Sequence, residues 1–369
     1  MAEPIRVAHV MGKMVGGGLE AVVMNYYRHI DRVRFQFDLL VDADSTLVPR
    51  GEVESLGGRV IEVPPYQNVL DNQRALTRLF RQEGWIIVHS HMNALSVFPL
   101  HAAYRAGVPV RIAHSHSTSG RGEFARNAMK AVLKTQANRY PTSRVACSKL
   151  AGDWLFGKGS EYSIIRNAIN LDRFAPEESS RQAVRNELGV ADGSLLVGHI
   201  GRFVKQKNHA LLLDIFKEVL KSEPDAVLAL AGEGPLMDAI RERAEALGIE
   251  GSIRFLGQRA DSAGLYRAFD VFCLPSLYEG LPMVGVECQA SGTPILASDA
   301  VTREVAMTSL MEFEALSSNP KVWARHLLSM RGCTFTDGDT EGLCAFDIRH
   351  AAKRLERLYA ECLGGTGAR

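Results

Sequence analysis

The feature of this sequence that most constrains its fold is a strand, loop and helix pattern that opens each half of the chain. Residues 5–10 form a short apolar run, which a glycine-rich loop and an amphipathic helical pattern ending at Ile30 follow. The same plan recurs over residues 195–221. Further short apolar runs alternate with helical patterns, which favours parallel sheets covered by helices. The sequence therefore predicts two similarly built α/β domains that face one another.

Composition limits the class of protein. The 369 residues suffice for two domains, each with its own core. A net charge of +1 argues against a general nucleic-acid binder. The six cysteines are scattered without a CxxC pair, which is typical of reduced thiols in a cytoplasm. The sequence has no 18-residue apolar span and no signal pattern, so we expect a chain that is neither exported nor membrane-spanning.

Residues 275–287 carry the most specific chemistry. An apolar run over 269–274 predicts a buried strand, and the helical pattern after Pro282 begins beyond a tight loop. Free amides and the helix dipole at the start of that helix favour an anion such as phosphate. Two carboxylates, Glu279 and Glu287, flank this point and are suited to accept hydroxyl groups. An anion site between two hydroxyl acceptors describes a nucleotide-diphosphate sugar.

The spacing Glu279-x7-Glu287, inside Pro-Ser-x-Tyr-Glu-Gly-x-Pro, resembles the E-x7-E motif of retaining glycosyltransferases of family 4. The resemblance implies the GT-B fold, in which two Rossmann-like parallel-sheet domains face each other across a cleft. It places an acceptor domain at 1–175 and a nucleotide-sugar domain at 176–345, with a C-terminal helix within 346–369 that crosses back to the first domain. Residues after 297 look most like the capsular and exopolysaccharide branch.

The same resemblance assigns roles to residues that match the family's motifs. The loop 201–208 resembles the family's Gly-Arg…Lys-x loop, so Arg202 and Lys207 would hold the diphosphate. Glu287 would hold the ribose and Glu279 the sugar hydroxyls. The catalytic set is then Glu279, His116, Arg202 and Lys207. The donor-binding set comprises Gly17, Gly18, Arg202, Lys207, Arg259, Glu279, Met283, Val284 and Glu287, with the two glycines taken from a Gly-Gly-x-Glu element.

Two histidine pairs leave alternatives open. His89 and His91 end one apolar run, and His114 and His116 end another. Histidines two apart on a strand share a face and can chelate a metal, which would indicate a metallohydrolase. Structural histidines are a second interpretation. By the resemblance, His116 matches the position beside the donor sugar, and this is the interpretation we favour.

Two further features are assigned to the surface. The basic residues between 121 and 139 favour a solvated helix face, and contact with anionic lipid head groups is the alternative. Two DxD triplets, at 42–44 and 337–339, are interpreted as turns rather than as a manganese motif. We therefore expect no metal and no cofactor.

Together these features predict a retaining, metal-independent glycosyltransferase. It would move a hexose from a nucleotide-sugar, with a UDP-sugar as the expected donor, to a lipid-linked saccharide in surface polysaccharide biosynthesis. The expected location is the cytoplasm, at the inner face of the plasma membrane. The alternatives are a GT-B sugar-nucleotide epimerase, a non-catalytic sugar-nucleotide binding protein and a paired-carboxylate glycosidase.

Overall fold

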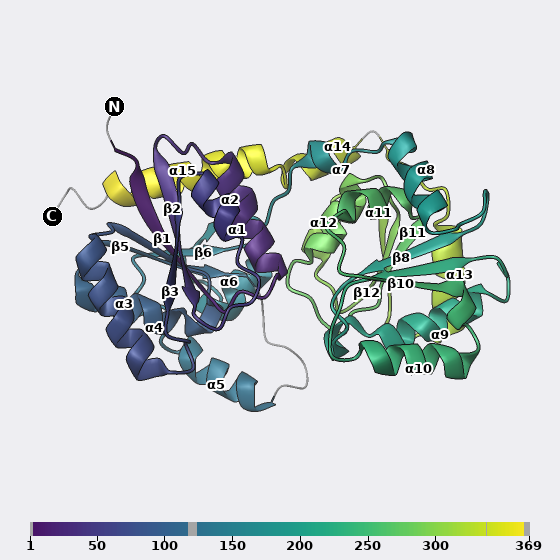
Figure 1. Cartoon of the computed structure of the whole chain (residues 1–369), viewed down its shortest axis with the longest axis horizontal. Coiled ribbons are helices and arrows are strands. Elements are labelled where there is room, and N and C mark those ends of the chain that lie inside the picture. The colour runs from purple at the N-terminus through teal and green to yellow at the C-terminus, as the bar shows by residue number, and fades with distance from the viewer. Residues whose placement is uncertain (1–2, 117–123, 337, 365–369) are drawn as a thin grey trace. The chain divides into compact units, whose positions relative to one another are not determined.

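The computed structural model describes residues 3–116, 124–336 and 338–364, and they fold into two compact units (Figure 1). The first unit comprises Met1–Ile169 and Phe346–Arg369, and the second comprises Asn170–Ala345. Each unit is built around one parallel sheet with helices on its faces. The predicted α/β class with two Rossmann-like domains is therefore confirmed.

The first unit contains a seven-stranded sheet in the order β3-β2-β1-β4-β5-β6-β7. Its strands are β1 (Ile5–Gly12), β2 (Phe35–Asp42), β3 (Arg59–Val63), β4 (Ile87–Ser90), β5 (Val110–Ser115), β6 (Ser143–Ala146) and β7 (Ser163–Ile164). Its helices are α1 (Gly18–His29), α2 (Arg50–Ser55), α3 (Val69–Glu83), η1 (Asn93–Ser96), α4 (Val97–Ala106), α5 (Phe124–Lys134), α6 (Lys149–Phe156) and α15 (Ile348–Gly364).

The second unit contains a six-stranded sheet in the order β10-β9-β8-β11-β12-β13. Its strands are β8 (Leu196–Ile200), β9 (Val227–Ala231), β10 (Ile253–Gly257), β11 (Val271–Leu274), β12 (Ile295–Ser298) and β13 (Met311–Glu314). Its helices are α7 (Leu171–Phe174), α8 (Glu178–Glu187), η2 (Lys205–Lys207), α9 (His209–Val219), α10 (Met237–Leu247), η3 (Glu250–Ser252), α11 (Ser262–Ala268), α12 (Met283–Ala290), η4 (Arg303–Val305), α13 (Pro320–Ser329) and α14 (Asp339–Cys344).

The strands appear in the sequence as continuous apolar runs because both of their faces are buried. Every residue of β9 and of β11 is buried, as expected for parallel strands that helices cover on both faces. In the second unit, Leu228, Phe216 and Trp323 belong to one apolar core that joins the sheet to α9 and α13.

The C-terminal helix α15 belongs to the first unit, as predicted. It packs on α1, where the Glu356 carboxylate accepts a hydrogen bond from the Asp31 amide at 2.9 Å. Tyr359 is fully buried and its ring lies 5.4 Å from that of Phe35. Backbone hydrogen bonds join Ile169 to Phe346 and Ile348, and they fix the position at which α15 begins.

Three local expectations differ from the structure. The boundary between the units lies before Asn170 rather than after Ala175, because α7 packs on α11 and α12 of the second unit. The polar sequence of residues 176–180 predicts a linker, but this stretch contains the start of α8, which Arg181 fixes by hydrogen bonds to the end of α11. Proline suits the first position of a helix, which would place Pro282 inside α12, but Pro282 lies just before the helix as its N-cap in an extended conformation.

Residues 232–235, whose Gly-x-Gly-Pro sequence predicts a turn after β9, support the loop that follows β8. A Cβ at Gly232, whose φ is +131°, would lie 2.3 Å from the carbonyl oxygen of Gly201. A Cβ at Gly234 would lie 2.6 Å from the carbonyl oxygen of Phe203. Only glycine allows the two loops to approach this closely.

We predict that Gly232→Ala destabilises the protein by about 2–4 kcal/mol, because the new methyl group meets backbone and the φ angle is strained. Chemical denaturation measures the change. Gly251→Ala is the control, since a Cβ at Gly251 meets nothing within 4 Å. Equal stability of the two variants would contradict this account of the loop.

Candidate active site

The strand order places candidate sites in each unit. It reverses between β1 and β4 in the first sheet and between β8 and β11 in the second. Ligands of open α/β sheets bind at the carboxyl ends of the strands where such a reversal occurs. In the second unit, the loops at this point are 201–208 and 275–282, which the sequence singled out.

These two loops of the second unit are hydrogen-bonded to each other. The Leu277 amide donates to the Gln206 carbonyl at 2.8 Å, and the Gln206 side-chain amide donates to the Tyr278 carbonyl at 3.0 Å. The Asn208 side-chain amide donates to the Pro275 carbonyl at 3.1 Å. The loops therefore form one ordered surface at the end of β8 and β11.

A buried ion pair lies within this surface. Lys207 Nζ is 2.6 Å from Glu279 Oε1, and the two side chains are only 15% and 8% exposed. The same oxygen accepts from Ser276 Oγ at 2.9 Å, and Oε2 accepts from Gln206 Nε2 at 3.1 Å. The structure thus joins two residues that the sequence assigned to different parts of the donor, and it fixes the orientation of the Glu279 carboxylate.

Cationic and amide groups beside this pair remain available to an anion. Arg202 is exposed, and its side chain has no hydrogen-bond or ion-pair partner among the described residues. The amides of Met283 and Val284 begin α12, which lacks a side-chain cap, and within residues 124–336 they find no acceptor. Such groups at a helix start bind phosphate well.

Glu287 lies on α12 in an environment that disfavours its charge. Burial raises the pKa of its carboxyl, although the Tyr266 hydroxyl donates to Oε2 at 2.9 Å and Arg173 acts in the opposite direction. The same burial raises the pKa of Tyr266. A carboxylate held by a neutral donor and short of further partners is suited to accept a hydroxyl group of a ligand.

Arg259 is engaged within the protein. Its guanidinium binds both oxygens of the Glu187 carboxylate, a partner that the sequence did not indicate, and this ion pair raises the pKa of Arg259. The side chain is therefore not free in the way that Arg202 is. The resemblance to the family implies that the backbone near Arg259 contacts the nucleotide base, and this contact stays a prediction.

The glycine-rich loop of the first unit shows different roles for its two glycines. Gly17 caps α1, and a Cβ there would lie 2.7 Å from Glu20 Oε2, because Glu20 folds back to accept from the Val15 amide at 2.9 Å. A Cβ at Gly18 would meet nothing within 4 Å. A side chain at Gly17 would therefore displace the Glu20 carboxylate from the Val15 amide, whereas a Cβ at Gly18 would extend into open space.

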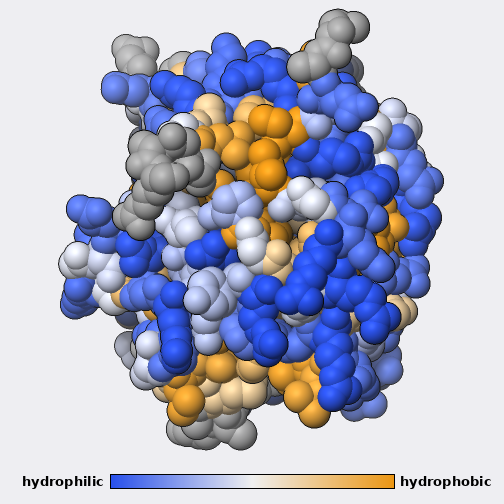
Figure 2. Space-filling view, turned by 90° about the vertical axis from the view of Figure 1, so that its left-hand side faces the viewer, coloured by the Kyte–Doolittle hydropathy of each residue, from blue (hydrophilic) through white to orange (hydrophobic). Residues whose placement is uncertain are grey.

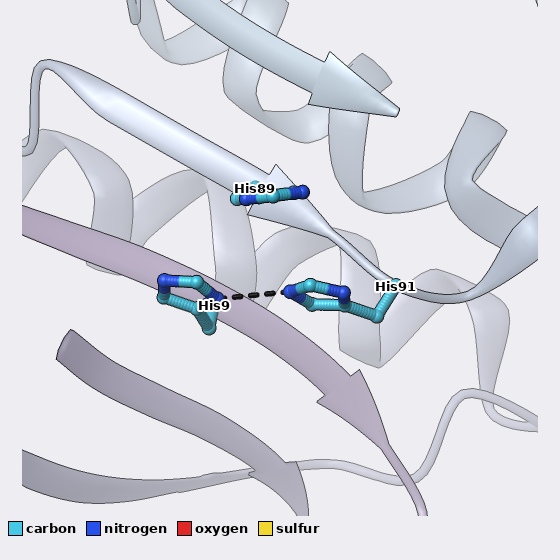
Figure 3. Close-up of side chains that lie close together, drawn as sticks. All are labelled: His9, His89 and His91. Atoms are coloured by element: carbon cyan, nitrogen blue, oxygen red, sulfur yellow. Dashed lines mark hydrogen bonds between the residues drawn. The ribbon is translucent and has the colours of Figure 1, made fainter. Parts of the chain in front are cut away.

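The first unit also gathers five histidines at the carboxyl ends of β1, β4 and β5. Four are the predicted pairs, and the fifth is His9 of β1, which lies opposite His89 in the sheet register. His9 Nδ1 is 2.9 Å from His91 Nε2 (Figure 3). His91 Nδ1 is 2.9 Å from His116 Nε2, and His89 Nε2 is 3.1 Å from His114 Nδ1. His9 was not among the predicted residues because no second histidine or other reactive side chain lies near it on β1.

These histidines are neutral. Burial lowers the pKa of His9 to about 3 and that of His116 to about 4, against nearby Asp38 and Asn167, which act in the opposite direction. Burial and the neighbouring histidines hold the pKa of His89, His91 and His114 well below the ordinary value. Two groups of three, His9-His89-His91 and His91-His114-His116, have nitrogens close enough to hold a metal ion.

Sequence comparison identifies the class. Residues 180–307 match the model described as "Glycosyl transferases group 1", and residues 17–166 match "Glycosyl transferase 4-like domain". The chain is 37% identical over 329 residues to "Putative glycosyltransferase EpsF" of Bacillus subtilis (strain 168), which covers 86% of each chain. The protein therefore belongs to the glycosyltransferases of family 4, as its motifs indicated.

Two further comparisons agree with this assignment. The chain is 24% identical over 312 residues to the UDP-Gal:alpha-D-GlcNAc-diphosphoundecaprenol alpha-1,3-galactosyltransferase of Escherichia coli, which covers 80% of this chain and 79% of the relative. A crystal structure of Anabaena Alr3699/HepE in complex with UDP-glucose superimposes with a TM-score of 0.80 and 18% identity, over 96% of this chain and 99% of that one. That likeness confirms the GT-B fold.

Acid should destabilise the protein through its buried histidines. Their pKa values are lowered in the folded state, so below about pH 6.5 the unfolded chain binds more protons than the folded chain. The free energy of unfolding therefore falls as the pH is lowered. We expect a loss of about 1 kcal/mol for each of His9 and His116 between pH 7.5 and 5.5 in denaturation experiments. His9→Gln should reduce the slope, whereas the exposed His350→Gln should not. Stability that stays constant over this range would contradict neutral burial.

Glu287→Gln should stabilise the unliganded protein. The amide carbonyl can still accept from Tyr266, while the cost of burying a carboxylate disappears, so we expect a gain of about 0.5–1.5 kcal/mol at pH 7.5. Thermal unfolding measures it, with Glu245→Gln on the exposed side of α10 as the control. A loss of stability relative to that control would show that the carboxylate is well satisfied where it lies.

Proposed function

We propose that this glycosyltransferase moves a sugar from a UDP-sugar to a saccharide acceptor, with retention of configuration and without a metal ion. The observation that carries the proposal is the arrangement of the second unit, where the Lys207–Glu279 pair lies within hydrogen-bonded loops beside free cationic and amide groups. This set supplies positive charge for a diphosphate and an oriented acceptor for a sugar hydroxyl.

The comparisons support uridine as the nucleotide of the donor. The name of the Escherichia coli relative gives UDP-Gal as its donor, and the Anabaena structure holds UDP-glucose. We propose the same nucleotide for this chain. The sugar itself is set by a few pocket contacts, which the fold does not determine.

Charge develops on the diphosphate as the bond to the sugar breaks. Arg202, Lys207 and the amides of Met283 and Val284 would stabilise that charge, which is the largest single contribution that such a site can make. No metal ion is needed for this role when cations and amides are already in place. Glu287 would accept hydroxyl groups of the ribose.

The contacts of Glu279 favour an orienting role over a nucleophilic one. A carboxylate offers about four acceptor positions, and Lys207, Ser276 and Gln206 occupy three of them. The remaining position can accept one sugar hydroxyl and thereby fix the reacting carbon. In the mechanism we propose, the acceptor hydroxyl attacks from the face of the leaving group, and the leaving phosphate takes its proton.

The acceptor is proposed to be a lipid-linked saccharide at the inner face of the plasma membrane. The Escherichia coli relative is named for a diphosphoundecaprenol acceptor. On α5, Met129 and Val132 are 48% and 68% exposed at a spacing that puts them on one face of the helix. Figure 2 shows hydrophobic areas in the upper middle and at the lower edge of a face that is otherwise largely hydrophilic. None of the helices that the structure describes is long and apolar enough to span a bilayer.

The test of this site is Glu279→Ala. We expect transfer to fall by at least about 100-fold, because the sugar loses its orienting contact, while UDP binding changes by no more than a few-fold. Initial rates and calorimetry measure the two quantities, with Glu245→Ala as the control. Loss of UDP binding would instead show that Glu279 acts on the nucleotide, either directly or by positioning Lys207. Turnover of the donor in native protein without an acceptor would favour an epimerase.

A further inference from the structure

The five histidines at the carboxyl ends of β1, β4 and β5 belong to one continuous series of hydrogen bonds. Four of them are fully buried, and His116 is half-buried at the end of the series. Tyr359 of α15 connects the pair His89–His114 to the other three histidines, since its hydroxyl is 2.8 Å from His89 Nδ1 and 3.5 Å from His9 Nε2. We call this series the histidine chain; in order it contains His114, His89, Tyr359, His9, His91, His116 and Asn167.

The geometry of the rings indicates hydrogen bonds rather than metal ligation. The rings of His9 and His91 are 9° from coplanar with centroids 5.1 Å apart, and the nitrogens that face each other are 2.9 Å apart (Figure 3). The rings of His89 and His114 are similarly 15° from coplanar. Nitrogens that point at one another within a common plane share a proton. Ligands of one ion would instead point at a common centre.

One end of the chain fixes the direction of its hydrogen bonds. A neutral imidazole has one donor and one acceptor nitrogen, so each bond determines the next. The Asn167 oxygen can only accept, so it receives the proton of His116 Nδ1 at 3.4 Å. His116 Nε2 must then accept from His91 Nδ1, and His91 Nε2 from His9 Nδ1. Up to this point every histidine carries its proton on Nδ1.

The other half of the chain continues in the same direction. His9 Nε2 accepts from the Tyr359 hydroxyl, and the Tyr359 oxygen accepts from His89 Nδ1. His89 Nε2 in turn accepts from His114 Nδ1. The last nitrogen, His114 Nε2, is buried and has no hydrogen-bond partner in the described part of the chain. It ends the chain as a bare acceptor.

The opposite direction is the only other order that satisfies every inner bond. It would require the Asn167 amide to turn, and it would leave His114 Nε2 as a buried N–H group. Orphaned buried donors are rarer in proteins than under-satisfied acceptors. The Ile165 carbonyl favours a proton on His114, but it makes no hydrogen bond of ordinary geometry with Nε2. We therefore take the first order as that of the resting protein.

We propose that the histidine chain holds His116 in the Nδ1-protonated form and presents it as a hydrogen-bond donor to a sugar hydroxyl. His91 occupies His116 Nε2, so only Nδ1 can turn to a ligand. The hydrogen bond from His116 Nδ1 to the Asn167 oxygen is long, at 3.4 Å, so a sugar hydroxyl can replace it. His91, His9 and Tyr359 are then positioning residues. This proposal rests on the proposed function only for the identity of the ligand as a saccharide.

The direct test is the tautomer of each histidine. Ring ¹⁵N spectra of the full-length protein at pH 7.5, assigned by single substitutions, should show all five chain histidines neutral and protonated on Nδ1. A proton on Nε2 of any of the five would overturn the proposed order. Stoichiometric Zn²⁺ that shifts three of these histidines together would show that the cluster is a metal site instead.

A pair of variants tests the positioning role. His91→Phe removes the group that holds His116 Nε2, so kcat/KM should fall about tenfold while affinity for UDP alone stays unchanged. His91→Gln keeps one donor and one acceptor and should recover most of the loss. His101→Gln, at a histidine of α4 outside the chain, is the control. A rise in KM for the donor would show that the hydroxyl bound by His116 belongs to the donor sugar. A rise in KM for the acceptor would show that it belongs to the acceptor.

The two proposals can fail separately. Native rates in a folded His91→Phe variant would overturn the positioning role and leave the transferase untouched. The tautomer measurement needs no substrate, so a protein that transfers no sugar but shows five Nδ1-protonated histidines would retain the ordered chain and lose the saccharide as its ligand.

Discussion

The ion pair between Lys207 and Glu279 is the interaction on which the site of the second unit depends. It links the loop after β8 to the loop after β11, at the point where the strand order reverses. Removing two charges from water costs free energy that their attraction repays only with additional hydrogen bonds. Ser276 and Gln206 supply those bonds to the carboxylate. The pair therefore specifies the arrangement of the loops more than it stabilises the unit.

The surroundings of this pair keep a positive character that a diphosphate can use. Arg202 is exposed in the same loop as Lys207, and α12 begins with amides that have no acceptor within the described second unit. Glu287, by contrast, is a carboxylate whose charge burial disfavours. The first unit uses a different chemistry, because burial keeps the five histidines of the histidine chain neutral and hydrogen bonds link them. One unit thus offers charge to a ligand, and the other offers directed hydrogen bonds.

The sequence predicted the sheets, the class and most of the candidate residues because these depend on local patterns. The apolar run before Pro275 and the helix after Pro282 were found from periodicity and from the E-x7-E spacing. The contact of Lys207 with Glu279 was not found, since it joins residues 72 apart in sequence. His9 was missed for a similar reason: nothing beside it on β1 suggests chemistry, and only the register of the sheet brings it to His89.

Two other differences also come from tertiary contacts. Arg259 was assigned to the nucleotide, and its partner Glu187 lies on a helix that begins inside the expected linker. The end of the first unit depends on a backbone pairing of Ile169 with the residues before α15, which no local signal reveals. Local propensity determines where each helix and strand forms. The partners of their side chains depend on the packing of segments that are distant in the sequence.

The central claim is that the second unit holds a nucleotide diphosphate without a metal ion. Calorimetric titration of the protein with UDP in the presence of EDTA tests it most directly. The account predicts saturable binding of one UDP that EDTA does not change and that Arg202→Ala weakens at least about tenfold, as the loss of a charge-assisted contact should. Binding that EDTA abolishes, or that Arg202→Ala leaves intact, would contradict it.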